Sequence, residues 1–116
     1  KDIELICQLS DNLCASTYTR IIDIANKEKM PYFAFATNQV ENGALLAVGR
    51  DYYQGGKDAI KLAVKIFKGE KPEDIPFEYV SKTNIAVNLN VADNFGITVP
   101  DSILNIADYI IDTKNE

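Results

Sequence analysis

The stretch ALLAVGRDYYQGGKDAIKLAVKIFKG, residues 44–69, decides the fold class of this chain. Residues 44–48 are an apolar run without alternation, which is typical of a strand covered on both faces of a parallel sheet. Asp51 then offers a side-chain oxygen that can cap the free backbone N–H groups at the start of a helix. From Ala59 onward the apolar residues fall at helical spacing, and Gly69 suits a left-handed helix end. The stretch therefore predicts a strand, a tight turn and a helix, which together form half of a βαβ unit.

The residues before this stretch show the same order of elements. Short apolar runs at residues 3–9 and 32–36 predict two strands, and residues 15–29 between them carry an apolar stripe at helical spacing. Strands that alternate with helices favour a parallel sheet with helices on its faces. A length of 116 residues allows one domain at most. We therefore predict an α/β fold with three layers, α/β/α, around a mainly parallel sheet.

The pattern changes after the helix that ends near residue 69. Residues 77–81, FEYVS, alternate between apolar and polar side chains, as an exposed or edge strand does. Residues 84–89 predict another strand. The last predicted element is a helix that begins at Pro100 or Asp101 and keeps a broad apolar face as far as Ile111.

The composition argues against several kinds of function. A formal net charge of −5 disfavours nucleic-acid binding, because no basic stripe is present to release counterions from phosphates. The chain has no histidine, so the commonest general base and the commonest zinc ligand are both missing. Cys7 and Cys14 are separated by a spacing that matches no common metal motif. We predict no catalytic residues, no metal site and no cofactor.

Polar turns follow three of the predicted strands, at residues 10–12, 37–39 and 50–53. Because the carboxyl ends of parallel strands lie along one edge of a sheet, we expect the three turns at the same edge. Their carboxylate, amide, hydroxyl and aromatic groups can hold a small polar ligand by hydrogen bonds and ring stacking. No nucleophile with its base, glycine-rich phosphate loop or zinc spacing accompanies them, so the turns indicate recognition rather than catalysis.

The polar residues of these turns also have purely structural interpretations. Asp11, Asn12 and Asp51 are ordinary helix caps in many proteins. Asn38 stabilises a turn by itself. Tyr52 is equally well explained as an aromatic residue of the core or its boundary. Each residue is a weak signal alone, and the argument for a site depends on three turns sharing one edge.

Four segments resemble a known family. They are SDN at residues 10–12, PYFAFATNQVENGALLAVGRDYYQGG at 31–56, KIFKGEKPEDIP at 65–76 and VNLNVADNFGITVPDSIL at 87–104. Together they resemble the C-terminal part of ABC-transporter substrate-binding proteins of the tryptophan/tyrosine-type group. These proteins are similar to the periplasmic binding proteins of the ribose- and leucine-binding class. The resemblance covers nearly the whole chain.

The resemblance implies a two-lobed protein without catalysis that closes on a small molecule, an amino acid or a related compound, and delivers it to a membrane permease. Such proteins are exported, and are lipid-anchored or periplasmic. By the same comparison, residues 1–116 form the second lobe of a type I periplasmic binding protein-like fold, and that lobe is incomplete. Residues 84–116 are expected near the crossover between lobes and in a C-terminal helix. The partners are the ligand, the permease and the first lobe of the same protein, and apolar surface without its cover is expected to favour self-association.

The resemblance also assigns ligand-binding roles, two residues to each polar turn. The family often has a Gly-Asp pair where Phe35 and Ala36 stand here. The lost carboxylate makes this wall of the pocket more apolar, which suits an aromatic or aliphatic ligand. Gly55 stands where a larger apolar residue is usual. The ligand-binding residues implied by the resemblance are Asp11, Asn12, Thr37, Asn38, Asp51 and Tyr52.

Two other classes of protein share this kind of fold. The ligand-binding core of a transcription regulator is the main alternative, and such a protein would dimerise. A small α/β enzyme of the flavodoxin or receiver type is a third hypothesis. A receiver needs an acidic cluster with a lysine at its strand ends, and Asp11 and Asp51 are too few for such a cluster. Because fold alone does not give function, the family resemblance decides for the binding protein.

Overall fold

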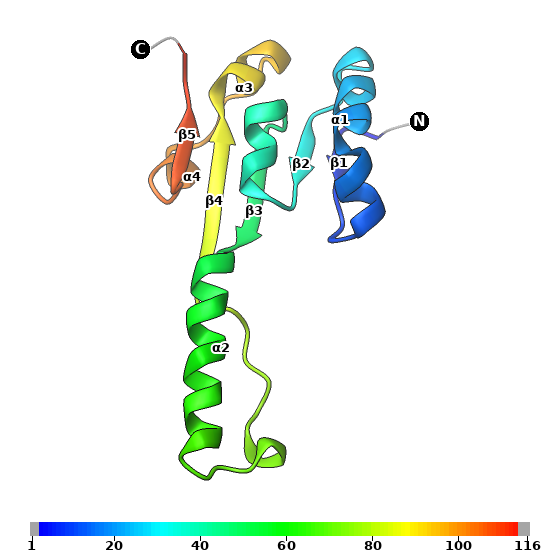
Figure 1. The fold of residues 1–116 in the computed structure, drawn as a ribbon. Helices are drawn as coiled ribbons and strands as arrows, with labels where there is room; N and C mark the ends of the chain where they lie inside the picture. The colour runs from blue at the N-terminus through cyan, green and yellow to red at the C-terminus, as the bar shows by residue number, and fades with distance from the viewer. Residues whose placement is uncertain (1–2, 114–116) are drawn as a thin grey trace. The chain divides into compact units, whose positions relative to one another are not determined.

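The computed structural model describes residues 3–113 (Figure 1). The chain divides into two compact units, each of which is described by itself. Among the described residues, unit 1 comprises residues 3–49 and 84–113, and unit 2 comprises Arg50–Thr83. Within the described range, none of the helices has the length and apolar character needed to cross a membrane.

A five-stranded sheet forms the centre of unit 1, in the strand order β1-β2-β3-β4-β5. The pairs β1–β2, β2–β3 and β4–β5 are parallel. β3 and β4 run in opposite directions, as their arrows in Figure 1 show, and the Asn88 N–H donates to the Leu45 carbonyl oxygen at 2.9 Å beside this pair. The predicted α/β fold with a mainly parallel sheet is therefore confirmed, with one antiparallel pair in its middle. The strands are β1 (Ile6–Cys7), β2 (Tyr32–Ala34), β3 (Leu46–Arg50), β4 (Thr83–Asn88) and β5 (Tyr109–Ile111).

One face of the sheet is covered by α1 (Asn12–Lys27). Ile22 and Ala25 of this helix belong to the same buried cluster as Tyr32 and Ala34 of β2. The apolar stripe predicted between the first two strands is therefore the packing face of this helix.

The opposite face carries a second, smaller cluster. It combines Val91 and Ala92 of α3 (Leu89–Phe95) with Phe33 and Leu46 of the sheet. Phe33 alternates along β2 with the residues of the first cluster, so its side chain points to the other face. Helices therefore lie on both faces, which gives the three layers expected from the sequence.

The predicted C-terminal helix is wrong over most of its length. Only α4 (Asp101–Leu104) forms, and the chain then enters the strand β5 (Tyr109–Ile111). Asp108 anchors that strand to β4, because its N–H donates to the Ile85 carbonyl oxygen at 2.8 Å and its carboxylate accepts from the Ile85 N–H at 2.9 Å. The apolar residues of this region fit a helical stripe, but pairing with an existing strand overrides that local preference. Residues 114–116 of the predicted second lobe lie outside the described residues.

The strand predicted at residues 77–81 is also wrong for this structure. These residues pair with no strand within the described part of the chain. A strand requires a neighbour for its backbone N–H and C=O groups, and alternation of side chains alone does not supply one.

Unit 2 is built on α2 (Tyr52–Phe67). The Asp51 carboxylate accepts from the Gln54 N–H at 2.9 Å, so the predicted cap is confirmed. Gly69 has a φ of 98°, the left-handed conformation predicted for the helix end.

The chain then passes through η2 (Pro72–Asp74) and returns along α2. The Asp58 carboxylate holds the returning segment against α2 by hydrogen bonds. It accepts from the Gln54 amide at 2.8 Å, the Lys61 ammonium at 2.8 Å and the Ser81 N–H at 2.9 Å. These donors, the Lys61 ammonium first, hold the pKa of Asp58 well below its usual range.

We expect Gly49→Ala to destabilise unit 1 by about 1–3 kcal/mol. A Cβ atom at Gly49 would lie 2.7 Å from the backbone oxygen of Phe35, and a backbone atom cannot move aside as a flexible side chain can. Urea unfolding of the two proteins measures the difference. Val48→Ala is the control, because the Val48 side chain is about half exposed and should cost less than about 1 kcal/mol. Equal losses for the two variants would contradict the close approach at Gly49.

We expect Asp58→Asn to weaken unit 2 at pH 7 and to flatten its response to acid. The folded pKa lies below the unfolded value of about 3.9, so the stability that Asp58 contributes is complete above that value. It is lost as the pH falls through the lower folded pKa. Urea midpoints between pH 7 and pH 2 measure this dependence. Asp74→Asn removes the same charge from an exposed position in η2, so it is the matched control and should leave the urea midpoint at pH 7 unchanged.

Candidate ligand-binding site

The carboxyl ends of β1 and β2 lie side by side. Cys7 is in register with Phe33, and the next backbone N–H, that of Gln8, donates to the Phe33 carbonyl oxygen at 2.9 Å. The Gln8 side-chain oxygen accepts from the Phe35 N–H at 3.4 Å. The first two polar turns therefore follow neighbouring strands at one edge of the sheet, as predicted.

The carboxyl end of β3 joins the same edge. Ala34 of β2 is in register with Ala47 of β3, and Gly49 lies against the Phe35 carbonyl oxygen. Because Gly49 has no side chain, the two strand ends can approach this closely. The edge of unit 1 is therefore formed by three parallel strands.

The first turn holds Asp11 and Asn12. Asp11 is the N-cap of α1, and its carboxylate accepts from the Leu13 N–H at 2.8 Å and the Cys14 N–H at 3.1 Å. The structural interpretation of Asp11 is therefore confirmed. Asn12 is the first residue of the helix, and both side chains are exposed.

The second turn is the short 3₁₀ helix η1 (Thr37–Asn42), which begins with two of the candidate residues. Thr37 is half-buried and Asn38 is exposed. Gln39 is buried, and its side-chain oxygen accepts from the Ala36 N–H at 3.3 Å. Gln39 therefore supports the turn from inside. Gln39 was not singled out in the sequence analysis, because its polar side chain gives no local sign of burial.

The candidates of unit 2 lie at the start of α2, where Asp51 is the N-cap and Tyr52 is the first residue. Asp51 caps the helix, its N–H donates to the Lys82 carbonyl oxygen at 3.1 Å, and its carboxylate lies 3.4 Å from the Lys82 ammonium. The Tyr52 side chain is 78% exposed, so it is not a core residue within the described part of the chain. Arg50, just before them, donates to the Thr83 hydroxyl at 2.8 Å and lies 5.5 Å from the centre of the Tyr79 ring.

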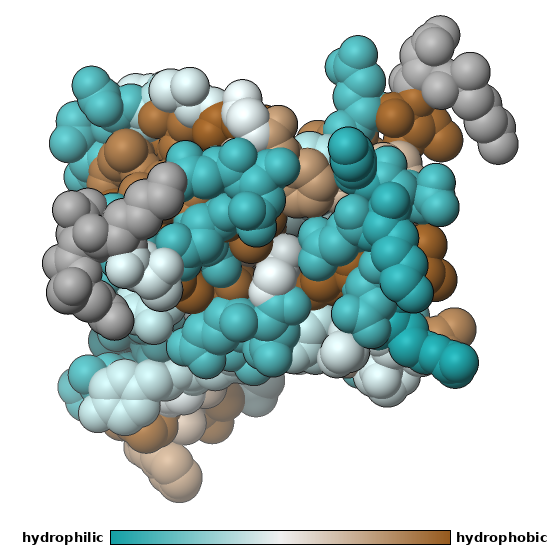
Figure 2. Space-filling view, turned by 90° about the horizontal axis from the view of Figure 1, so that it is seen from above, coloured by the Kyte–Doolittle hydropathy of each residue, from teal (hydrophilic) through white to brown (hydrophobic). Residues whose placement is uncertain are grey.

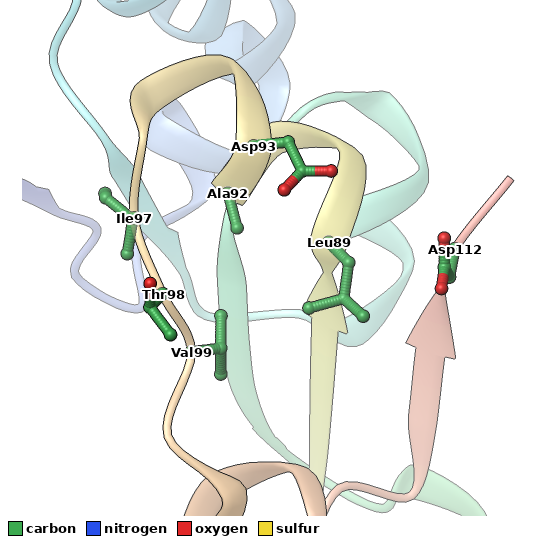
Figure 3. A pocket seen from close by; sticks show the side chains of 7 residues that line it. All are labelled: Leu89, Ala92, Asp93, Ile97, Thr98, Val99 and Asp112. Atoms are coloured by element: carbon green, nitrogen blue, oxygen red, sulfur yellow. The ribbon is translucent and has the colours of Figure 1, made fainter. Parts of the chain in front are cut away.

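A separate pocket of about 440 Å³ lies at the other edge of the sheet (Figure 3). Leu89 follows the end of β4 and Asp112 follows the end of β5, and these strands run opposite to β1–β3. Figure 2 looks onto this edge and shows apolar residues among hydrophilic ones. None of the six candidate residues lines this pocket. Its lining residues are Leu89, Ala92, Asp93, Ile97, Thr98, Val99 and Asp112.

Residues 3–113 hold no group of three or more histidine, cysteine, aspartate or glutamate side chains that could bind a metal ion. Cys7 is exposed, Cys14 is half-buried and both are free thiols. Burial raises the pKa of the Tyr32 hydroxyl, with a smaller contribution from Cys14. Tyr32 is the first residue of β2, at the opposite end of the strand from the candidate turn.

Comparison with known proteins identifies relatives of this chain. A tyrosine-binding protein of Clostridioides difficile (strain R20291) is 33% identical over 86 residues, which cover 74% of this chain and 25% of that protein. An uncharacterized protein of Rickettsia prowazekii (strain Madrid E) is 33% identical over 89 residues, which cover 77% of this chain and 29% of that protein. The chain therefore spans less than a third of the length of these two relatives.

Solved structures give the same result. A conserved domain protein from Vibrio cholerae has a TM-score of 0.77 at 33% identity and matches 92% of this chain and 36% of its own. The ABC domain in complex with L-Trp from Streptococcus pneumonia has a TM-score of 0.77 at 32% identity and matches 95% of this chain and 38% of its own. A ligand-free, open substrate-binding protein with adhesive properties from Clostridium difficile has a TM-score of 0.67 at 29% identity, with 92% and 36% matched.

A family model described as ABC transporter substrate binding protein matches residues 1–111. Since this match covers nearly the whole chain, the chain belongs to the family of ABC transporter substrate-binding proteins.

Proposed function

We propose that this chain is part of the solute-binding component of an ABC importer, and that it binds an amino acid or a related small molecule for delivery to a membrane permease. One observation carries the proposal: β1, β2 and β3 are parallel, and polar side chains follow them at the edge where open α/β sheets bind ligands. Two similar proteins support the ligand class. One is named a tyrosine-binding protein, and the other was solved in complex with L-Trp.

The proposed protein has two lobes that close on the ligand. Unit 1 supplies part of the second lobe, and polypeptide beyond the matched region of the relatives corresponds to the rest. We put the crossings between lobes at the unit boundaries, after Gly49 and before Asn84, instead of giving all of residues 1–116 to the second lobe. The expectation that residues 84–116 lie near the crossover between lobes stays a prediction.

The candidate side chains of unit 1 suit an amino-acid zwitterion. The Thr37 hydroxyl and the Asn38 amide can donate to a carboxylate, and the Asp11 carboxylate can accept from an ammonium group. Phe35, half-buried at the same edge, adds apolar surface where the family often has a carboxylate. That replacement favours a ligand with an aromatic or aliphatic side chain.

Asp51 and Tyr52 of unit 2 are proposed as ligand contacts on the family resemblance. The exposed Tyr52 ring offers a face for stacking. The protein is proposed to act by binding alone, without catalysis, cofactor or nucleic acid. It is proposed to work outside the cytoplasm, as a lipid-anchored or periplasmic protein, because its task is to present a solute to a permease.

We expect L-tyrosine or L-tryptophan to raise the melting temperature of the protein at its full natural length. A ligand at about 100 times its Kd stabilises the folded state by about 2.7 kcal/mol, which shifts the midpoint by several degrees. Differential scanning fluorimetry against the amino acids, with common sugars as controls, measures this shift. The importer proposal fails if no amino acid shifts the midpoint while the protein dimerises and binds promoter DNA, as a transcription regulator would.

We expect two variants of Asp11 to separate helix capping from ligand binding. Asparagine caps a helix as well as aspartate does, so Asp11→Asn should keep the unfolding free energy, while Asp11→Ala should lower it by about 1 kcal/mol. Both should weaken amino-acid binding by about tenfold or more, because each removes a hydrogen bond to a charged group. Urea unfolding and calorimetric titration measure the two effects.

The control for these variants is Asp23→Asn, which removes the same charge from an exposed position on the same helix. It should leave both stability and affinity unchanged. An Asp11→Asn protein with the affinity of the wild type would remove Asp11 from the binding site and leave it as a cap.

A further inference from the structure

The pairing of β1 with β2 ends in a hydrogen bond from a side chain. The Gln8 N–H donates to the Phe33 carbonyl oxygen at 2.9 Å. A regular parallel pair would continue with a bond from the Phe35 N–H to the backbone carbonyl of Gln8. The Phe35 N–H instead donates to the Gln8 side-chain oxygen at 3.4 Å. The Gln8 amide therefore takes the place of the next backbone bond, at the carboxyl ends of the two strands.

The neighbouring backbone N–H group is occupied in the same way. The Ala36 N–H donates to the Gln39 side-chain oxygen at 3.3 Å. Two consecutive N–H groups after β2 are thus bonded to glutamine oxygens of this chain, so neither is a free donor for a ligand.

The oxygen of the Gln8 amide is used in this contact, but its nitrogen is not. Because an N–H group can only donate, the oxygen and not the nitrogen must face Phe35. Among residues 3–113, the Gln8 side-chain nitrogen has no hydrogen-bond partner and is not sealed from solvent. The amide group is planar, so the bond from Phe35 also sets the direction of the NH₂ group. A half-buried amide with a fixed oxygen and two free donor hydrogens is therefore available to a ligand.

Gln8 lies between two of the candidate turns. It stands just before the turn that holds Asp11, and its bond to Phe35 carries its side chain across to the strand end that precedes Thr37. The Thr37 hydroxyl and the Asn38 amide are already proposed as donors to a ligand carboxylate. The Gln8 nitrogen adds a third neutral donor at this corner of the edge.

We propose that Gln8 is a specificity-determining residue of the ligand-binding site, and that its side-chain nitrogen donates to the carboxylate of the bound amino acid. This inference rests on the proposed function and adds a residue that lies outside the polar turns. Of the two charged groups of an amino-acid zwitterion, the carboxylate accepts hydrogen bonds and the ammonium only donates them. The Gln8 nitrogen therefore selects the carboxylate, and the Asp11 carboxylate is left for the ammonium.

The contact also gives the ligand a direction in the site. Its carboxylate lies toward the end of β2, where Gln8 and Thr37 donate. Its ammonium lies toward the start of α1, where Asp11 accepts. A solute that lacks the carboxylate leaves the Gln8 donors without a partner, which lowers its affinity relative to the amino acid.

Two variants at Gln8 separate ligand binding from support of the strand ends. Gln8→Glu keeps an oxygen for the Phe35 N–H but replaces the NH₂ group by a second oxygen, which repels a carboxylate. Gln8→Leu removes both groups. In the protein at its full natural length, we expect both variants to weaken binding of L-tryptophan or L-tyrosine by about tenfold or more, and Gln8→Glu the more strongly. Only Gln8→Leu should lower the urea midpoint. Calorimetric titration and urea unfolding measure the two effects.

A purely structural role for Gln8 gives a different order. The Gln8→Glu protein would then bind like the wild type, because its carboxylate oxygen still accepts from Phe35, and that result overturns the proposal. Asn94→Asp is the control, since it adds the same charge at an exposed position of α3. It should leave the affinity unchanged. A loss equal to that of Gln8→Glu overturns the proposal, because the added charge would then act without a local contact.

L-Tryptophanamide identifies the part of the ligand that Gln8 contacts. Its neutral amide can donate to the carboxylate that Gln8→Glu introduces, whereas the carboxylate of L-tryptophan cannot. We expect Gln8→Glu to shift the ratio of the two affinities toward the amide by about tenfold or more. Loss of both ligands by the same factor overturns the assignment to the carboxylate.

The wild-type protein in the same titrations separates this inference from the proposed function. Wild-type binding of L-tryptophan or L-tyrosine, with equal binding by Gln8→Glu, rejects the role of Gln8 and leaves the binding function standing. A wild-type protein that binds no amino acid rejects the proposed ligand class, and the role of Gln8 with it.

Discussion

A single buried amide joins the elements that meet in unit 1. Asn88 is 6% exposed, and its backbone N–H donates to the Leu45 carbonyl oxygen at 2.9 Å. Its side-chain nitrogen donates to the Val40 carbonyl oxygen of η1 at 2.7 Å, and its side-chain oxygen accepts from the Val91 N–H at 3.1 Å, which caps α3. A buried amide is costly unless its hydrogen bonds are made, so Asn88 is favourable only where the start of β3, η1 and α3 are all in place. The strand β4, the turn that carries Thr37 and the second face of the sheet are therefore fixed by the same residue.

This anchoring explains how polar residues can be presented at the edge of the sheet without loss of order. Hydrogen bonds from the side chains of the buried Asn88 and Gln39 hold η1 in place. The Asn38 side chain is therefore not needed to stabilise the turn and can remain exposed. Gly49 allows the ends of β2 and β3 to approach closely beside this turn. The side chains that are proposed to bind a ligand thus stand on a turn that is held by hydrogen bonds from the buried Gln39 and Asn88. Such preorganisation lowers the entropy that binding would otherwise cost.

The sequence predicts the elements whose signals are local. The apolar run before Asp51, the Asp51 cap and Gly69 define β3 and α2, and the polar turn at Asp11 marks the start of α1. Strand pairing is not local, so the antiparallel partner of β3 could not be predicted from alternation or composition. The same limit explains why the helix predicted as far as Ile111 does not form. Its apolar, β-branched residues fit both a helix and a strand, and pairing with β4 makes the end of this segment a strand. The six candidate residues were accessible to sequence reasoning as polar turns, whereas Gln39 and Asn88 gain their roles only through burial.

The helix starts in both units bear on the kind of ligand. In unit 1, Asp11 accepts from two N–H groups of α1, and the Gln39 side chain accepts from the Ala36 N–H before η1. In unit 2, Asp51 accepts from an N–H group at the start of α2. Phosphate groups bind at helix starts whose N–H groups are free, and an aspartate cap both occupies such groups and repels a second anion. The proposed recognition of a zwitterion by side chains agrees with these occupied N–H groups better than a phosphorylated or strongly anionic solute would.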